Sequence, residues 1–124
     1  MSSSPTSIPA PPLLTDADRE RLLANGRRAI HEPAFDPLPV VKLFTPDGAA
    51  TWLLTELDPD DPDLAFGLCD LGLGSPELGR VSLAELASVR GRLGLPVERD
   101  AHFRADKPLS AYAAEAHRSG WVLA

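Results

Sequence analysis

The chain has 124 residues, which is enough for one domain with a single hydrophobic core and too few for two. Apolar residues make up 44% of it, so a buried core is expected, and the single cysteine excludes an internal disulfide bond and suits a reducing compartment. The net charge of −6 is unevenly placed, because residues 43–79 hold eight acidic residues and neither lysine nor arginine. The remainder holds ten acids against all twelve basic residues, which weakens any simple case for a nucleic-acid-binding face.

The first twelve residues are mainly serine, proline, threonine and alanine, a composition typical of a disordered arm. They lack the basic segment and the long apolar stretch of a secretory signal. No apolar run in the chain approaches the roughly 20 residues that span a bilayer. We therefore expect a cytoplasmic protein with an arm at residues 1–12 and a single α+β domain at residues 13–124.

A short helix is predicted at residues 17–24, directly after the arm. Thr15 is a suitable N-cap, and carboxylates at positions 16 and 18 complement the positive end of the helix dipole. The pair Asn25 and Gly26 predicts a left-handed stop for this helix. Three prolines in residues 31–39 then predict an irregular, extended connection.

A β-hairpin is predicted next, with strands at residues 40–45 and 50–57 around a turn at residues 46–48, Pro-Asp-Gly. Strict alternation in the second strand separates two sets of side chains: Trp52, Leu54 and Glu56 on one face, and Leu53, Thr55 and Leu57 on the other. Residues 58–63 predict a stiff, solvated acidic loop, and residues 64–71 predict a third strand.

Residues 78–83 predict a short fourth strand that runs into a helix. This helix has a capping box of Ser82 and Glu85, and Gly91 is expected to end it. A last helix is predicted at residues 109–119, between Pro108 and Gly120. The economical fold is α+β, an antiparallel meander of about four strands packed with two or three short helices.

The predicted acidic loop holds four aspartates: Asp58, Asp60, Asp61 and Asp63. An EF-hand calcium loop is excluded, because the fifth and twelfth positions counted from Asp58 are Pro62 and Cys69. A solvated hairpin loop explains the aspartates, and an irregular divalent-cation site or a charged surface for a partner protein are the alternatives. The three histidines have no local metal-ligand spacing, so we predict neither a metal site nor a cofactor.

No motif of a catalytic site is present. The serines at positions 75 and 82 lack a nucleophile elbow, and the glycines of residues 72–79 lack the spacing of a phosphate-binding loop. One acid–base candidate is His102 with Glu98 and Asp100 nearby, where a carboxylate would orient the imidazole. A surface ion-pair cluster explains the same residues better, and we predict no catalytic residue.

Six basic residues follow the acidic block: Arg80, Arg90, Arg92, Arg99, Arg104 and Lys107. They would contact nucleic acid if they lined one face. Few aromatic residues lie between them, so a base-stacking platform has little support, and ordinary solvated charge is the better explanation.

Several segments, taken in order, carry a resemblance to a known protein family. They are VVKLFTP at 40–46, WLLTELDP at 52–59, FGLCDLG at 66–72, PELG at 76–79, VSLAEL at 81–86 and LGLPVERD at 93–100. Together they closely resemble the bacterial domain of unknown function 2958, over about residues 13–119. The resemblance implies a small accessory product of plasmids and integrative elements, often encoded near replication, transfer or anti-restriction functions. No established activity or catalytic residue comes with it.

The leading functional hypothesis is a non-enzymatic accessory protein of a mobile genetic element that binds a host or element-encoded protein. Its predicted binding residues are the four aspartates, whose roughly phosphate-like spacing would mimic DNA for a partner such as a restriction or CRISPR component. Two alternatives stay open. One is a nucleic-acid-associated factor that uses the basic terminal regions, and the other is an enzyme centred on Glu98, Asp100 and His102. The partner's identity and the oligomeric state stay open as well.

Overall fold

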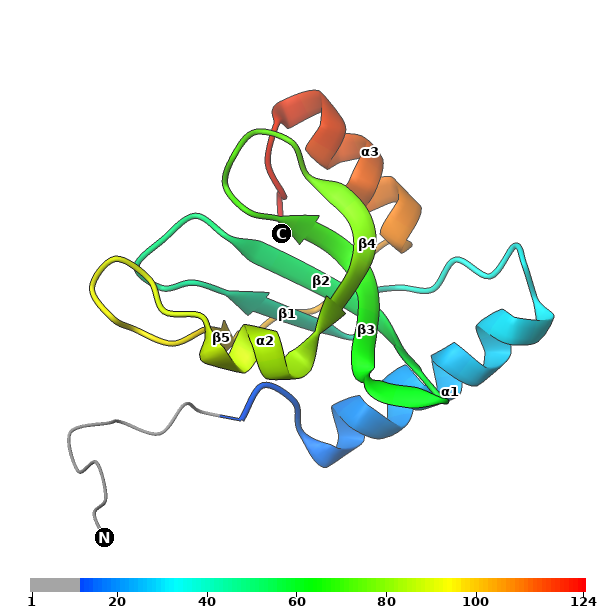
Figure 1. Ribbon diagram of the computed structural model, residues 1–124. Coiled ribbons are helices and arrows are strands. Elements are labelled where there is room, and N and C mark those ends of the chain that lie inside the picture. The colour runs from blue at the N-terminus through cyan, green and yellow to red at the C-terminus, as the bar shows by residue number, and fades with distance from the viewer. Residues whose placement is uncertain (1–11) are drawn as a thin grey trace, which may run out of the picture.

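The computed structural model describes residues 12–124, which form a five-stranded antiparallel sheet and three helices (Figure 1). The α+β prediction is confirmed. The predicted arm lies outside the described residues except for its last residue, Pro12. In chain order the helices and strands are α1 (Asp16–His31), β1 (Val41–Phe44), β2 (Thr51–Asp58), β3 (Asp61–Asp70), β4 (Glu77–Ser82), α2 (Leu83–Ser88), β5 (Glu98–Arg99) and α3 (Leu109–Ser119).

The sheet is a meander with one added strand. Its strand order is β4-β3-β2-β1-β5, so the first four strands follow one another and β5 returns to the free edge of β1. The predicted first hairpin is confirmed, with Val41 opposite Leu54 and Phe44 opposite Thr51. At the far edge, Arg99 of β5 lies opposite Leu43.

The sheet has a hydrophobic core on each face. Leu22 of α1 and Leu86 of α2 pack with Trp52 and Leu54 on one face, whereas α3 packs on Leu53 on the other. Neighbouring residues of a strand point to opposite faces, so α1 and α2 cover one side of the sheet and α3 covers the other (Figure 1). The sheet is therefore the middle layer of the fold.

A β-bulge at Thr55 changes the alternation in β2. Leu54 lies opposite Gly67 and Glu56 lies opposite Phe66, so Thr55 is the extra residue. Beyond the bulge the faces exchange, and Leu57 joins the core under α1 instead of the face of Leu53. The alternation predicted for Glu56 and Leu57 was therefore wrong, and the bulge keeps the Glu56 carboxylate out of that core.

Helix α1 is twice as long as predicted. Thr15 is its N-cap as expected, but the helix continues through Asn25 and Gly26 to His31. Gly26 is buried against β2, and the side-chain amide of Asn25 donates a hydrogen bond to the Thr55 carbonyl (2.9 Å). These two residues dock the helix on the sheet, because only a residue without a side chain lets the helix approach so closely.

Two other boundaries differ from the prediction. Residues 58–63 are not a loop, because β3 begins at Asp61 directly after a two-residue turn. Helix α2 ends at Ser88, before Gly91, and Gly91 instead lies against the carboxylate of Asp47 in the β1–β2 turn. Helix α3 has the predicted limits, and Gly120 ends it in the left-handed conformation with φ 83°.

Candidate functional site

The tip of the β2–β3 hairpin carries three of the four aspartates that the sequence singles out. Asp58 and Asp61 lie opposite each other, which leaves Pro59 and Asp60 as the turn. The Asp58 carboxylate accepts a hydrogen bond from the Asp60 amide (2.8 Å), and the ring of Pro59 fixes its φ, so the turn is rigid. Asp60 and Asp61 are exposed and Asp58 is partly buried. The tip therefore presents three carboxylates from a rigid backbone turn.

The fourth aspartate, Asp63, has a structural role. Its two carboxylate oxygens accept hydrogen bonds from the Ser82 hydroxyl (2.6 Å) and the Ala84 amide (2.9 Å). These bonds, the one from Ser82 first, hold the pKa of Asp63 below its ordinary value. The Ser82 hydroxyl in turn accepts a bond from the Glu85 amide (3.2 Å), which is one half of the predicted capping box. The return bond from the Ser82 amide to the Glu85 carboxylate is not formed within residues 12–124, so Ser82 acts as a simple N-cap. Asp63 thereby fastens β3 to the first turn of α2.

A hollow of about 440 Å³ lies beside the hairpin tip, between the second half of α1 and strands β2 to β4. We call it the acidic hollow. Its charged lining consists of three carboxylates and one guanidinium, from Glu56, Asp58, Asp60 and Arg80. Its apolar lining includes Ile30, whose side chain is 63% exposed, and Phe66. The hollow thus combines negative charge with accessible apolar surface.

Glu56 is a partly buried carboxylate of this lining. It lies opposite Phe66, which lies opposite Arg80, so the three form one row across three strands. Burial raises the pKa of Glu56, and the charge of Arg80 opposes that shift. Among residues 12–124 the Glu56 carboxylate has no hydrogen-bond or ion-pair partner. The sequence signal for this residue is an acid among the mainly apolar residues of β2, and the sequence analysis does not predict it as a site residue.

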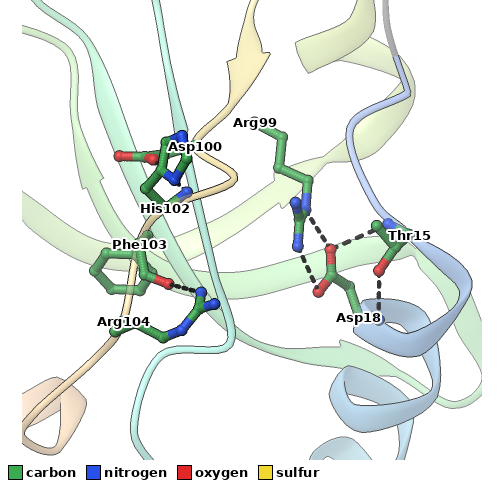
Figure 2. A network of polar contacts seen from close by, with 7 residues as sticks. All are labelled: Thr15, Asp18, Arg99, Asp100, His102, Phe103 and Arg104. Atoms are coloured by element: carbon green, nitrogen blue, oxygen red, sulfur yellow. Dashed lines mark hydrogen bonds and ion pairs between the residues drawn. The ribbon is translucent and has the colours of Figure 1, made fainter.

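A second polar site lies at the N-terminal end of α1 (Figure 2). Asp18, which is 5% exposed, accepts hydrogen bonds from Arg99 at Nε (2.6 Å) and Nη2 (3.2 Å). It also forms a capping box with Thr15, each side chain accepting a bond from the other residue's amide (3.0 Å). Burial by itself raises the pKa of Asp18, but the hydrogen bonds from Arg99 and Thr15 outweigh it and lower the pKa. This ion pair ties β5 to α1.

A hollow of about 240 Å³ adjoins the ion pair, and we call it the arginine cleft. Three arginines line it: Arg21 of α1, Arg99 of β5 and Arg104 farther along the same segment. Figure 2 shows Arg99 and Arg104. Asp18 and Asp100 also line it, but each already has a cationic partner. Asp18 has Arg99, and Asp100 lies 3.5 Å from the ammonium group of Lys42.

The residues of the enzyme alternative are only partly brought together. Asp100 and His102 line one shallow depression of about 320 Å³, but exposed Glu98 lines none of the three hollows described here. The Asp100 carboxylate accepts a hydrogen bond from the backbone amide of His102 (2.9 Å), which closes a local turn. Within residues 12–124 no carboxylate is hydrogen-bonded to the imidazole, so nothing orients this ring for proton transfer.

The six basic residues that follow the acidic block serve different sites. Arg80 lines the acidic hollow, Arg90 donates to backbone carbonyls at the end of α2, and Lys107 pairs with Glu115 (3.0 Å). Two of the six, Arg99 and Arg104, line the arginine cleft. Arg21, from the N-terminal part of the chain, lines it with them. No local sequence signal predicts this meeting, because it depends on how α1 docks against β5.

Cys69 is half-buried against the core under α1, and burial raises the pKa of its thiol. The thiol therefore stays protonated at neutral pH and is a poor nucleophile. In the described part of the chain, no three His, Cys, Asp or Glu side chains form a group that could hold a metal ion. The helices of that part are all too short or too polar to cross a membrane.

The family whose description reads "Protein of unknown function (DUF2958)" matches residues 13–123, nearly the whole chain. The resemblance inferred from the ordered segments is thereby confirmed. No curated protein and no solved structure matches the chain significantly. The family match therefore brings no assigned activity, and any function has to be argued from the two sites.

Proposed function

The chain belongs to the family of proteins of unknown function DUF2958, and from that premise we propose that it is a non-enzymatic accessory protein that binds a partner protein through the acidic hollow and the hairpin tip. The observation that carries this function is Glu56, a half-buried carboxylate in the hollow without a partner among residues 12–124. Partial burial of this charge costs stability, and the charge of Arg80 offsets only part of that cost. A cation supplied by another protein would remove that cost, which favours binding.

The chemistry of the hollow selects a basic side chain with an apolar neighbour. Glu56, Asp58 and Asp60 offer carboxylate oxygens, and a guanidinium group binds a carboxylate through two parallel hydrogen bonds. Ile30 and Phe66 supply apolar contact area beside them. A protein whose basic surface otherwise binds DNA has the matching charge.

The rigid hairpin turn supports the mimicry of DNA by carboxylates. Because Pro59 and the hydrogen bond within the turn fix the backbone, little conformational entropy is lost when the tip is bound. The family resemblance supports the wider setting, an accessory protein of a mobile genetic element. In this function the partner is a host or element-encoded protein of the cytoplasm. If the partner is a restriction or CRISPR component, the protein acts against host defence.

The test is capture of a partner from a lysate of the organism that encodes the protein, followed by titration calorimetry with the purified partner. The binding variant neutralises the three acids of the tip, Asp58→Asn, Asp60→Asn and Asp61→Asn. A matched control neutralises three exposed acids elsewhere, Glu20→Gln, Glu77→Gln and Glu98→Gln. We expect the control to bind like wild type and the binding variant to bind at least about tenfold more weakly. Equal affinity of the two variants would refute an interface at the tip.

Glu56→Gln separates binding from folding. Since burial of the carboxylate disfavours its charged form, removing the charge should leave the free energy of unfolding unchanged or raise it. The same exchange should weaken partner binding. Asp63 is tested apart from the other acids, because Asp63→Asn also removes the bonds that hold α2. If Glu56→Gln binds the partner as tightly as wild type, the hollow is not part of the interface.

A further inference from the structure

Three arginines from distant parts of the chain converge at the arginine cleft, although only the Arg99 guanidinium is needed by the fold. Arg99 uses Nε and Nη2 on Asp18, and the remaining N–H groups of its guanidinium form no hydrogen bond within residues 12–124. Arg104 donates from Nη1 to the Phe103 carbonyl (2.9 Å), and its other N–H groups form no hydrogen bond within residues 12–124. Arg21 is exposed and has no hydrogen-bond partner within residues 12–124. The cleft is therefore rich in unused donors.

The acceptors in the cleft are already occupied. Both carboxylate oxygens of Asp18 accept bonds from Arg99. Asp100 accepts a bond from the His102 amide on one oxygen and faces Lys42 with the other. The two aspartates are thus neutralised by their partners, and the guanidinium groups give the cleft an excess of positive charge. What is missing is a ligand that offers several acceptor oxygens and negative charge.

We propose that the arginine cleft binds a phosphate group carried by an organic ligand. Phosphate offers acceptor oxygens in the geometry that guanidinium groups match with paired hydrogen bonds. Apolar side chains such as Leu38, Val40 and Phe103 also line the cleft and supply a small contact area for the sugar attached to the phosphate. A nucleotide and the backbone of a single-stranded nucleic acid both supply this chemistry. The site is separate from the acidic hollow and does not rest on the proposed function.

The test is nuclear magnetic resonance titration of the full chain, labelled with nitrogen-15, at low ionic strength. The probes are inorganic phosphate, adenosine monophosphate and a short oligothymidine. We expect saturable chemical-shift changes of the backbone amides of residues 99–104 with at least one of these phosphate-bearing probes. The double variant Arg21→Gln, Arg104→Gln should bind at least about tenfold more weakly, since each charge-assisted bond adds to affinity. Arg99 is left unchanged because it holds Asp18.

A matched control removes the same charge elsewhere, with Arg92→Gln and Arg118→Gln, two exposed arginines outside the cleft. Equal weakening by both double variants would overturn the site and indicate diffuse attraction. The absence of shifts in residues 99–104 with all three probes would overturn it as well. The oligothymidine result identifies a single-stranded nucleic acid as the ligand under one condition. The logarithm of its binding constant should fall with the logarithm of the salt concentration, with a slope near −0.7 per phosphate contacted. Binding of adenosine monophosphate and phosphate alone identifies a free nucleotide.

Discussion

Replacing Gly26 by alanine tests the docking of α1 on the sheet. A Cβ atom at this position would lie 1.9 Å from the carbonyl oxygen of Leu57, 3.1 Å from its carbon and 3.3 Å from Cδ of Pro59. The first of these distances is far below any real contact, and the obstacle is strand backbone, which cannot rotate away like the end of a side chain. Helix α1 would have to move off β2 by about 1 Å or more.

The expected magnitude combines three effects. Overpacking of this kind costs about 1–3 kcal/mol, and the hydrogen bond from Asn25 to the Thr55 carbonyl, which the shift would stretch, contributes about 1 kcal/mol. Alanine is the better helix former by about 1 kcal/mol, which offsets part of the loss. We therefore expect Gly26→Ala to lower the free energy of unfolding by about 2 kcal/mol, measured by urea denaturation followed by circular dichroism.

Two further variants decide between explanations. At Gly79 the added Cβ meets nothing within 4 Å and the backbone is not left-handed, so Gly79→Ala should change stability by no more than about 0.5 kcal/mol. If Gly26 were instead a left-handed helix stop, asparagine would replace it nearly as well. A Gly26→Asn variant as stable as wild type, or a Gly26→Ala variant more stable than it, would refute the close contact between α1 and β2.

Two other predictions concern the polar contacts that join distant segments. Asp18→Asn should lower the free energy of unfolding by about 2 kcal/mol at neutral pH, because it removes the charged hydrogen-bond partner of the partly exposed Arg99. Since the folded state lowers the pKa of Asp18, its stabilisation is present above the ordinary value of 3.8 and is lost as the pH falls through the folded pKa, so the variant and wild type should converge in acid. Ser82→Ala should cost about 1 kcal/mol as a lost helix cap, and urea denaturation of the double variant with Asp63→Asn should show less than additive loss, because the two side chains share one network.

The elements predicted well are those that local chemistry determines. The turn at residues 46–48 and the strands around it were found because proline and glycine have backbone preferences of their own. The limits of α3 follow from Pro108 and Gly120 in the same way. The N-caps Thr15 and Ser82 were found from residue type and spacing alone.

The errors lie where tertiary packing overrides a local signal. Asn25 and Gly26 have the composition of a helix stop, yet the contact with β2 gives the same two residues a docking role. The bulge at Thr55 was invisible to a strict alternation, because nothing in the residue types marks it. The first residues of β3 were read as loop because prolines and acids are rare in strands, but the tight turn brings them into register.

The same contrast between local signals and tertiary packing separates the site residues that the sequence predicts from those that it does not. The four aspartates stand out in the sequence because they are close together in it, and three of them do lie on one turn. Glu56 was missed because its position depends on the bulge. Arg21 was missed because its neighbours in the cleft come from the other end of the chain. A composition can indicate that charge is concentrated, but the fold decides which charges share a site.

Helix α1 contributes residues to both sites. Its N-terminal half contributes Arg21 to the arginine cleft, and its C-terminal half contributes Ile30 to the acidic hollow. Arg21 and Ile30 are nine positions apart, a rise of about 14 Å along the helix, which exceeds the screening length of about 8 Å at physiological salt. Neutralising one site should therefore leave the field at the other almost unchanged, and a partner that carries both basic side chains and phosphates would find a matching surface at each end of the same helix.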